Sequence, residues 1–135
     1  MARPSDRLPD WEPRLCAYLG TCAARPFEWG RHDCALFLAG GIEAMTGIDP
    51  ARKLRGTYGS AKEGRARLKQ MGFGSLIELV GQHLPEQPPL QAQPGDAALV
   101  DRKALGIVQG SLVYVLRREG LGLVPLSRAT QAWEV

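Results

Sequence analysis

Cys34 is the residue with the clearest capacity for chemistry, because it follows Asp33 at the expected start of a helix. A cysteine in the first turn of a helix lies near free backbone amides and the positive end of the helix dipole, which favour the thiolate. Asp33 opposes this effect, since a neighbouring carboxylate disfavours a second negative charge. The sequence therefore leaves the direction of the Cys34 pKa shift open. A thiol nucleophile would also need a nearby general base and a group that orients it.

Two histidines are candidates for that base. His32 stands two residues before Cys34 and could approach the sulfur if the loop is extended. Next to the apolar residues Phe27 and Trp29, however, it could simply hydrogen-bond the loop backbone, and we favour this structural role. His83 falls on the apolar face of its expected helix, so we interpret it as a satisfied histidine at the core or its edge.

A metal centre is a further alternative, because Cys16, Cys22, His32 and Cys34 are all potential zinc or iron ligands. Cys16 and Cys22 lie six residues apart on one expected helix, so their side chains diverge by about 120° and do not converge easily on one ion. Cys22 also belongs to the apolar stripe of that helix and is typical of a small buried hydrophobe. We expect no metal site and no cofactor, although the sequence leaves metal binding by Cys16 or Cys22 open.

The basic residues between positions 52 and 69 could bind phosphate or an acidic partner; they are Arg52, Lys53, Arg55, Lys62, Arg65, Arg67 and Lys69. Such a run is more often a solvated surface. The net charge is only +3, and only Tyr58 is interleaved as a stacking residue. We therefore do not expect nucleic-acid binding.

The elements that must position Cys34 begin with helices. A helix from Asp10 is predicted by apolar residues at i, i+3, i+4 and i+7, from Leu15 to Cys22. Asp33 caps a second helix, from about Cys34 to Met45, whose apolar residues surround its axis, which predicts a central buried helix. Its Gly40-Gly41 pair permits close approach of neighbouring backbone. Two shorter helices follow capping boxes at Ser60 and Ser75.

The second half of the chain has a different pattern. A proline-rich connector over 84–94 cannot be helical and is expected to lie on the surface. After the Pro94-Gly95-Asp96 turn, in which Asp96 is best explained as a turn residue, come four short apolar runs divided by turns: 97–100, 105–108, 112–116 and 121–124. Helices followed by an antiparallel meander predict an α+β fold over a single domain, residues 1–135.

Composition limits the class of protein. The chain has 135 residues, 44% of them hydrophobic, which suffices for one domain with a proper core. It contains no apolar run long enough to span a membrane, and the residues after Met1 lack the apolar stretch of a secretory signal. Three cysteines cannot form a complete disulfide framework. We therefore expect a reduced protein that folds in a cytoplasm.

Two stretches resemble the NlpC family of papain-like cysteine peptidases: 29–37, Trp-Gly-Arg-His-Asp-Cys-Ala-Leu-Phe, and 93–100, which includes the Pro-Gly-Asp turn. The resemblance implies a papain-like fold with Cys34 at the nucleophile position and a pocket near Phe27, Trp29, Gly30 and Ala104. The family's base histidine opens the next strand, where this chain has Ala104. The family's third polar residue is also unmatched, on the strand over 112–116. Ala104 thus implies a degenerate site.

The chain also resembles a family of small proteins encoded in the tail-gene modules of bacteriophages and prophages. Shared residues include Pro26-Phe27-x-Trp29-Gly30-Arg31-His32-Asp33-Cys34, Arg55-Gly56-x-Tyr58 and Ala132-Trp133-x-Val135. The two resemblances together imply a non-enzymatic tail-tip or baseplate protein that binds other tail-tip proteins. It would be made in the host cytoplasm and then incorporated in the virion tail. The alternative is an active cysteine endopeptidase or amidase that acts on peptidoglycan during phage entry, with His32 or another residue as its base.

Overall fold

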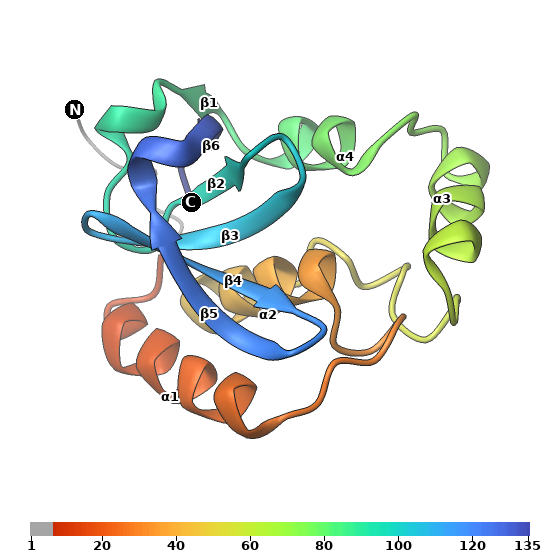
Figure 1. The fold of residues 1–135 in the computed structure, drawn as a ribbon, viewed down its shortest axis with the longest axis horizontal. Helices are drawn as coiled ribbons and strands as arrows, with labels where there is room; N and C mark the ends of the chain where they lie inside the picture. The colour runs from red at the N-terminus through yellow and green to blue at the C-terminus, as the bar shows by residue number, and fades with distance from the viewer. Residues whose placement is uncertain (1–6) are drawn as a thin grey trace.

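The computed structural model describes residues 7–135. Residues 1–6 lie outside the described part. They belong to the domain expected over 1–135 and to the segment in which we expect no secretory signal. Within it, four helices precede a six-stranded antiparallel sheet, so the predicted α+β class is confirmed (Figure 1).

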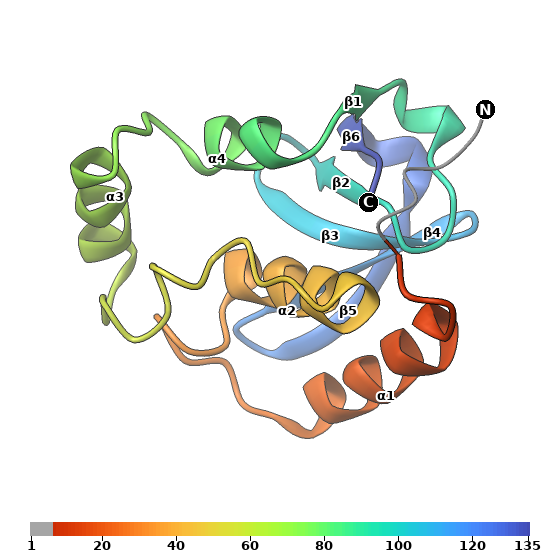
Figure 2. The same ribbon diagram turned by 180° about the vertical axis from the view of Figure 1, so that it is seen from behind.

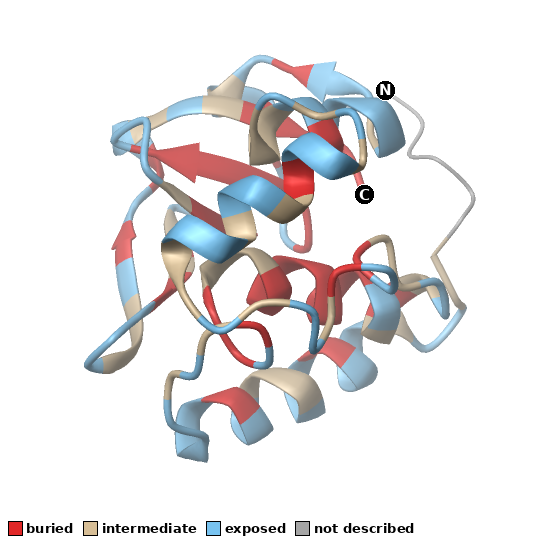
Figure 3. Cartoon of the chain, turned by 90° about the vertical axis from the view of Figure 1, so that its right-hand side faces the viewer, coloured by how far each residue is buried: buried red, intermediate tan, exposed pale blue. Residues whose placement is uncertain are grey.

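The helices are α1 (Trp11–Ala24), α2 (Cys34–Thr46), α3 (Ala61–Gln70) and α4 (Leu76–His83). α2 is the buried central helix that the sequence predicts, with eight of its residues in the core (Figure 3). It packs between α1 and strands of the sheet. In Figures 1 and 2, α3 stands at the end of the molecule remote from α1, and α4 connects it to the sheet.

The starts of the helices follow the capping residues of the sequence. Asp33, Ser60 and Ser75 each accept a hydrogen bond from a backbone N–H three residues later, as expected of N-caps. Asp10 differs, because its carboxylate makes no cap and instead pairs with the exposed Arg14 at 2.8 Å. The sequence therefore predicted the start of α1 correctly, but not the hydrogen bond that the Asp10 side chain makes.

The glycine pair of α2 is packed as the sequence indicates. A Cβ atom at Gly40 would lie 2.3 Å from the Tyr18 hydroxyl oxygen, and one at Gly41 would lie 2.4 Å from the Ile107 Cδ1 atom. Tyr18 donates a hydrogen bond of 2.6 Å to the carbonyl of Phe37. The missing side chains of Gly40 and Gly41 thus let α1 and β3 approach α2.

The strands are β1 (Glu86–Gln87), β2 (Ala97–Val100), β3 (Ala104–Gln109), β4 (Leu112–Arg117), β5 (Gly120–Pro125) and β6 (Ala129–Trp133). Short 3-10 turns occur at Pro89–Gln91 and Leu126–Arg128. The meander β2 to β5 is confirmed, but the sheet order is β1-β6-β2-β3-β4-β5. The last strand therefore returns to lie between β1 and β2, and the connector over 84–94 contains an edge strand and a 3-10 turn.

The two faces of the sheet bury different clusters. One face packs on α1 and α2 through residues such as Leu99, Leu105 and Ile107. The other face gathers small aliphatic residues of five strands, among them Val100, Val113 and Ala132. Because these side chains meet one another in one cluster, the sheet is curled around them.

Asp96 is more than the turn residue that the sequence suggests, since it is fully buried. Its carboxylate accepts hydrogen bonds from the side chains of Arg7 at 2.9 Å and Gln87 at 2.8 Å, and from the backbone N–H groups of Gln93 at 2.9 Å and Val135 at 3.2 Å. Arg7 also donates to the carbonyl of Val135 at 2.8 Å. This Asp96 network joins Arg7 and Val135 to the connector over 84–94.

Candidate functional site

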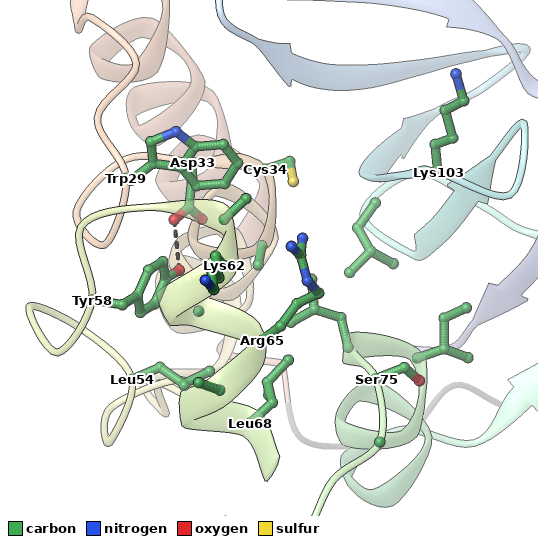
Figure 4. A pocket seen from close by; sticks show the side chains of 18 of the residues that line it. Trp29, Asp33, Cys34, Leu54, Tyr58, Lys62, Arg65, Leu68, Ser75 and Lys103 are labelled. Carbon is green, nitrogen blue, oxygen red and sulfur yellow. Dashed lines mark hydrogen bonds between the residues drawn. The ribbon is translucent and has the colours of Figure 1, made fainter. Parts of the chain in front are cut away.

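Cys34 lines a pocket of about 590 Å³ between the body of the molecule and the α3–α4 segment. We call it the Cys34 pocket. Its walls come from the Cys34 loop, α3, the start of α4 and the turn between β2 and β3. The lining includes Trp29, Asp33, Cys34, Tyr58, Lys62, Arg65, Lys69, Ser75, Arg102 and Lys103, with Leu54, Leu68, Leu76, Leu99 and Leu105 among its apolar residues (Figure 4).

The loop before α2 is tightly folded, which fixes the position of Cys34. Glu28 and His32 form an isolated antiparallel bridge around the turn. At its tip Gly30 has a φ of +80°, and a Cβ atom there would lie 1.9 Å from the carbonyl oxygen of Tyr58. The carbonyl of Gly30 accepts a hydrogen bond of 2.8 Å from the N–H of Gly56. Only glycine therefore fits this position, where the loop touches the segment before α3.

Asp33 is the centre of polar contacts beneath the pocket. Its carboxylate is 1% exposed and accepts three hydrogen bonds: from the N–H of Leu36 at 3.0 Å, the N–H of Gly30 at 2.9 Å and the hydroxyl of Tyr58 at 2.5 Å. Figure 4 shows the bond to Tyr58. Burial and the hydrogen bond to Asp33 raise the pKa of Tyr58 well above its ordinary value. Asp33 thus joins the Cys34 loop, α2 and the segment before α3.

The pKa of the Cys34 thiol is raised by burial and, secondarily, by the charge of Asp33. Backbone hydrogen bonding at the start of α2 acts in the opposite direction and does not compensate. The structure therefore resolves the question that the sequence left open. Desolvation and the neighbouring carboxylate together outweigh the helix terminus, and the neutral thiol is favoured.

His32 does not line the Cys34 pocket. It borders a separate pocket of about 450 Å³, together with Tyr18, Arg25, Glu43 and Arg55. The ring is 2% exposed, and its Nε2 atom has no hydrogen-bond partner among the described residues. Burial, followed by the charge of Arg25, lowers the pKa of His32. The structure thus keeps the proposed substitute base and the thiol on different pockets.

The other expected pocket residues divide in the same way. Trp29 lines the Cys34 pocket, whereas Gly30 borders the His32 pocket. Phe27 packs on the core and meets Trp29 edge to face at 4.9 Å. Ala104 lies against the cluster on the far face of the sheet, and its neighbour Leu105 faces the pocket. Ala104, which the NlpC resemblance puts at the base position, is therefore not among the residues that line the Cys34 pocket.

Sequence reasoning missed two contributors to the Cys34 pocket. Arg102 and Lys103 belong to the turn between the apolar runs 97–100 and 105–108, and this turn forms the wall opposite α3. Tyr58 was seen only as a stacking residue, but it binds Asp33. The residues themselves were visible in the sequence, whereas the parts of the chain that they face in the fold, α3 and Asp33, are 25 or more residues away.

The cysteines and histidines do not gather around one point. Cys16 is exposed, Cys22 is buried and Cys34 is partly buried. Across residues 7–135, no group of three or more His, Cys, Asp or Glu side chains is arranged to hold a metal ion. No helix in the same range is long and apolar enough to cross a membrane.

Comparisons with known proteins give one match. A search of curated proteins finds no match to the chain, and a search of solved structures finds none. A family model described as a domain of unknown function, DUF6950, matches residues 6–135, which includes every residue of the Cys34 pocket. The chain therefore belongs to the DUF6950 family.

Proposed function

We propose that this protein is a structural or assembly component of a bacteriophage or prophage tail. In this proposal its fold descends from a papain-like, NlpC-type cysteine peptidase and serves as a binding scaffold, not as a hydrolase. It would assemble with other tail-tip proteins in the host cytoplasm and remain in the virion tail. The tail assignment is supported by the sequence resemblance, and the loss of catalysis is supported by the Cys34 pocket.

The observation that carries the proposal is that the described residues around the thiol include neither a histidine nor a free carboxylate. Among the described residues that line the Cys34 pocket there is no histidine, and Asp33 is the only carboxylate. Both oxygens of Asp33 already accept hydrogen bonds, including the short one from Tyr58. A general base must reach the proton that it removes, and no free acceptor side chain of this kind lines the pocket.

The state of the thiol supports the same conclusion. A cysteine nucleophile attacks as the thiolate, and catalytic cysteines have lowered pKa values. Here burial and Asp33 raise the pKa of Cys34. Cys34 combines the helix position of a nucleophile with an environment that opposes its ionisation.

The order of elements is consistent with a papain-like ancestry. A cysteine at the start of a buried helix precedes an antiparallel sheet, and β2 begins directly after Pro94-Gly95-Asp96. This is the order that the NlpC resemblance implies. The large pocket would then be the remnant of a substrate cleft that has been kept for binding.

The second candidate function is an active cysteine endopeptidase or amidase of peptidoglycan. The observation that favours it is the placement of Cys34, which is partly exposed at the first residue of α2 and borders a pocket large enough for a substrate. This candidate requires a base from outside the residues that line the pocket.

Peptidoglycan digestion distinguishes the two candidates. Purified full-length protein and a Cys34→Ser variant are incubated with sacculi, and released muropeptides are measured by mass spectrometry beside an active cysteine endopeptidase. We expect no cleavage product from either form. Release of cleaved stem peptides by the native protein, abolished in Cys34→Ser, would show that the scaffold proposal is wrong.

The tail assignment is tested separately. We expect mass spectrometry of purified virions to detect the protein in the tail fraction. We further expect Cys34→Ser phage to remain infectious, while deletion of the gene blocks tail assembly. Absence of the protein from virions, combined with normal assembly after deletion, would contradict a tail role.

A further inference from the structure

We propose that the Cys34 pocket binds an acidic peptide segment of another protein. This inference rests on the proposed binding function and specifies the chemistry of the partner. The observation behind it is a set of five exposed basic residues around the pocket: Lys62, Arg65 and Lys69 on α3, and Arg102 and Lys103 on the β2–β3 turn. We call this set the basic rim.

The basic rim is not paired with acidic residues of the described part of the chain. No residue of the rim forms a salt bridge with any residue of 7–135, although Arg14, Arg31, Arg55 and Arg128 elsewhere on the molecule do. The pocket's only carboxylate, Asp33, is buried and engaged in hydrogen bonds. In Figure 4 the Arg65 guanidinium points from α3 into the cavity, toward the side on which Cys34 lies. Like charges around one concave surface create a positive potential that favours an anionic ligand.

The spacing of the rim favours a chain of carboxylates over a single small anion. Lys62 and Lys69 are seven residues apart on α3, which is about 10 Å along the helix axis. That span matches about three residues of an extended peptide. The start of α2 is the natural place for a phosphate, but the amide of Leu36 there is occupied by Asp33, whose charge repels an anion.

The floor of the pocket requires apolar groups from the ligand. It is formed by leucine side chains, including Leu54, Leu68 and Leu105, below the charged rim. A peptide with acidic and aliphatic residues in alternation presents both kinds of group at the required spacing. A nucleic acid would match only the charge, because Tyr58 is bound to Asp33 and Trp29 packs against Phe27. We therefore infer a peptide as the ligand.

The β2–β3 turn supports a binding role for Arg102. Asp101 and Arg102 have φ values of 53° and 60°, in the left-handed region that glycine adopts far more easily. Asp101 is held by its ion pair with Arg128, but Arg102 has no such contact among the described residues. An arginine thus stands at a position where glycine would relieve backbone strain, and strained positions of this kind are frequent at functional sites.

A titration monitored by amide NMR tests the inference on the full-length protein. The probe is a blocked hexapeptide of alternating glutamate and leucine, and its matched control replaces each glutamate with glutamine. We expect only the glutamate peptide to shift amides around the Cys34 pocket, saturably and with a dissociation constant below about 1 mM. Arg65→Glu should weaken binding by about tenfold or more, since it reverses a central charge.

Two further variants make the test specific. Arg102→Gly should weaken binding severalfold while leaving the melting temperature unchanged or higher. Arg52→Glu reverses an exposed charge that does not line the pocket, so it should leave binding unchanged. Equal binding of the glutamine peptide, no shifts with the glutamate peptide up to about ten times the expected 1 mM constant, or equal weakening by Arg52→Glu would overturn the inference.

The same titration is repeated with the alternative ligands, inorganic phosphate and an oligothymidylate. Inorganic phosphate or an oligothymidylate that binds the pocket more tightly than the glutamate peptide would contradict a peptide ligand. Failure of peptide binding leaves the peptidoglycan result untouched. Conversely, Cys34-dependent cleavage of peptidoglycan would refute the non-enzymatic scaffold whether or not the peptide binds.

Discussion

Replacement of Asp33 by asparagine is expected to destabilise the protein strongly, even though the two side chains have the same shape. The amide oxygen can still accept from Leu36, and the Tyr58 hydroxyl can turn to accept from the new NH₂ group. The N–H of Gly30, however, then faces a donor in a buried site. Loss of charged hydrogen bonds and one unsatisfied buried donor should lower the free energy of unfolding by about 2–4 kcal/mol.

Companion variants separate the contacts of Asp33. Tyr58→Phe removes one donor, so we expect a loss of about 1–2 kcal/mol in the native background. In the Asp33→Asn background the same change should cost less, because the charged partner is gone. Asp10→Asn is the matched control: it makes the same substitution at the first cap position, where the carboxylate is exposed and caps nothing.

Urea unfolding followed by circular dichroism measures these differences by linear extrapolation. The reasoning is refuted if Asp33→Asn is no more destabilising than Asp10→Asn. It is also refuted if Tyr58→Phe costs as much in the Asp33→Asn background as in the native protein. Either result would mean that the buried carboxylate does not hold the Cys34 loop to the segment before α3.

Three further outcomes are expected. Gly40→Ala should lower the free energy of unfolding by about 1–3 kcal/mol, because the new methyl group would overlap the Tyr18 ring and this overlap outweighs the gain in helix propensity. Gly20→Ala in α1, with open space around it, should raise the free energy of unfolding by about 0.5–1 kcal/mol. Urea unfolding of both variants measures the two changes. Because burial lowers the pKa of His32, the stability that its neutral ring contributes is complete above the unfolded pKa of about 6.5 and is lost as the pH falls below it. His32→Gln should therefore reduce the pH dependence of the melting temperature between about pH 7 and 5. An unchanged pH dependence would contradict the lowered pKa. Since burial raises the pKa of Cys34, its alkylation by iodoacetamide at pH 8 should be slower than that of free cysteine and should accelerate only at higher pH. A rate maximum near neutral pH would indicate an activated thiolate and would contradict the raised pKa.

Short-range signals in the sequence were sufficient to predict the helices. Asp33, Ser60 and Ser75 each bond a backbone N–H three residues later, so the cap and its partner belong to one local pattern. The buried character of α2 was equally visible, because its apolar residues surround the axis. Such features depend on neighbours within one helical turn, and their outcome therefore follows from the local sequence.

The order of the sheet could not be predicted in the same way. Ala129–Trp133 has a weak apolar pattern, so β6 was not recognised, and its place between β1 and β2 depends on pairing with residues about 30 or more positions away. The place of Ala104 is a related case, because it was expected at the pocket but packs against the cluster on the far face of the sheet. A motif alignment gives a residue's place along a strand, whereas the face depends on the register of the whole sheet.

The candidate site was predictable in its parts but not in its assembly. Cys34, Asp33 and Trp29 were expected at the pocket, and the structure places all three there. The basic residues of α3 and the charged β2–β3 turn were both visible in the sequence as separate features. Their common pocket arises only from the tertiary arrangement, and so does the separation of His32 from Cys34.

The Asp96 network has a consequence for synthesis of the chain. Its donors among the described residues come from positions 7, 87, 93 and 135, so residues 7–135 would all have to leave the ribosome before this set of hydrogen bonds can form. A nascent chain could form α1 and α2 early, but the carboxylate before β2 could be buried with these donors only after residue 135 has emerged. Closure of the fold around Asp96 is thereby coupled to the emergence of residue 135 from the ribosome, and Val135→Pro, which lacks the backbone N–H, would remove a donor from a fully buried charge.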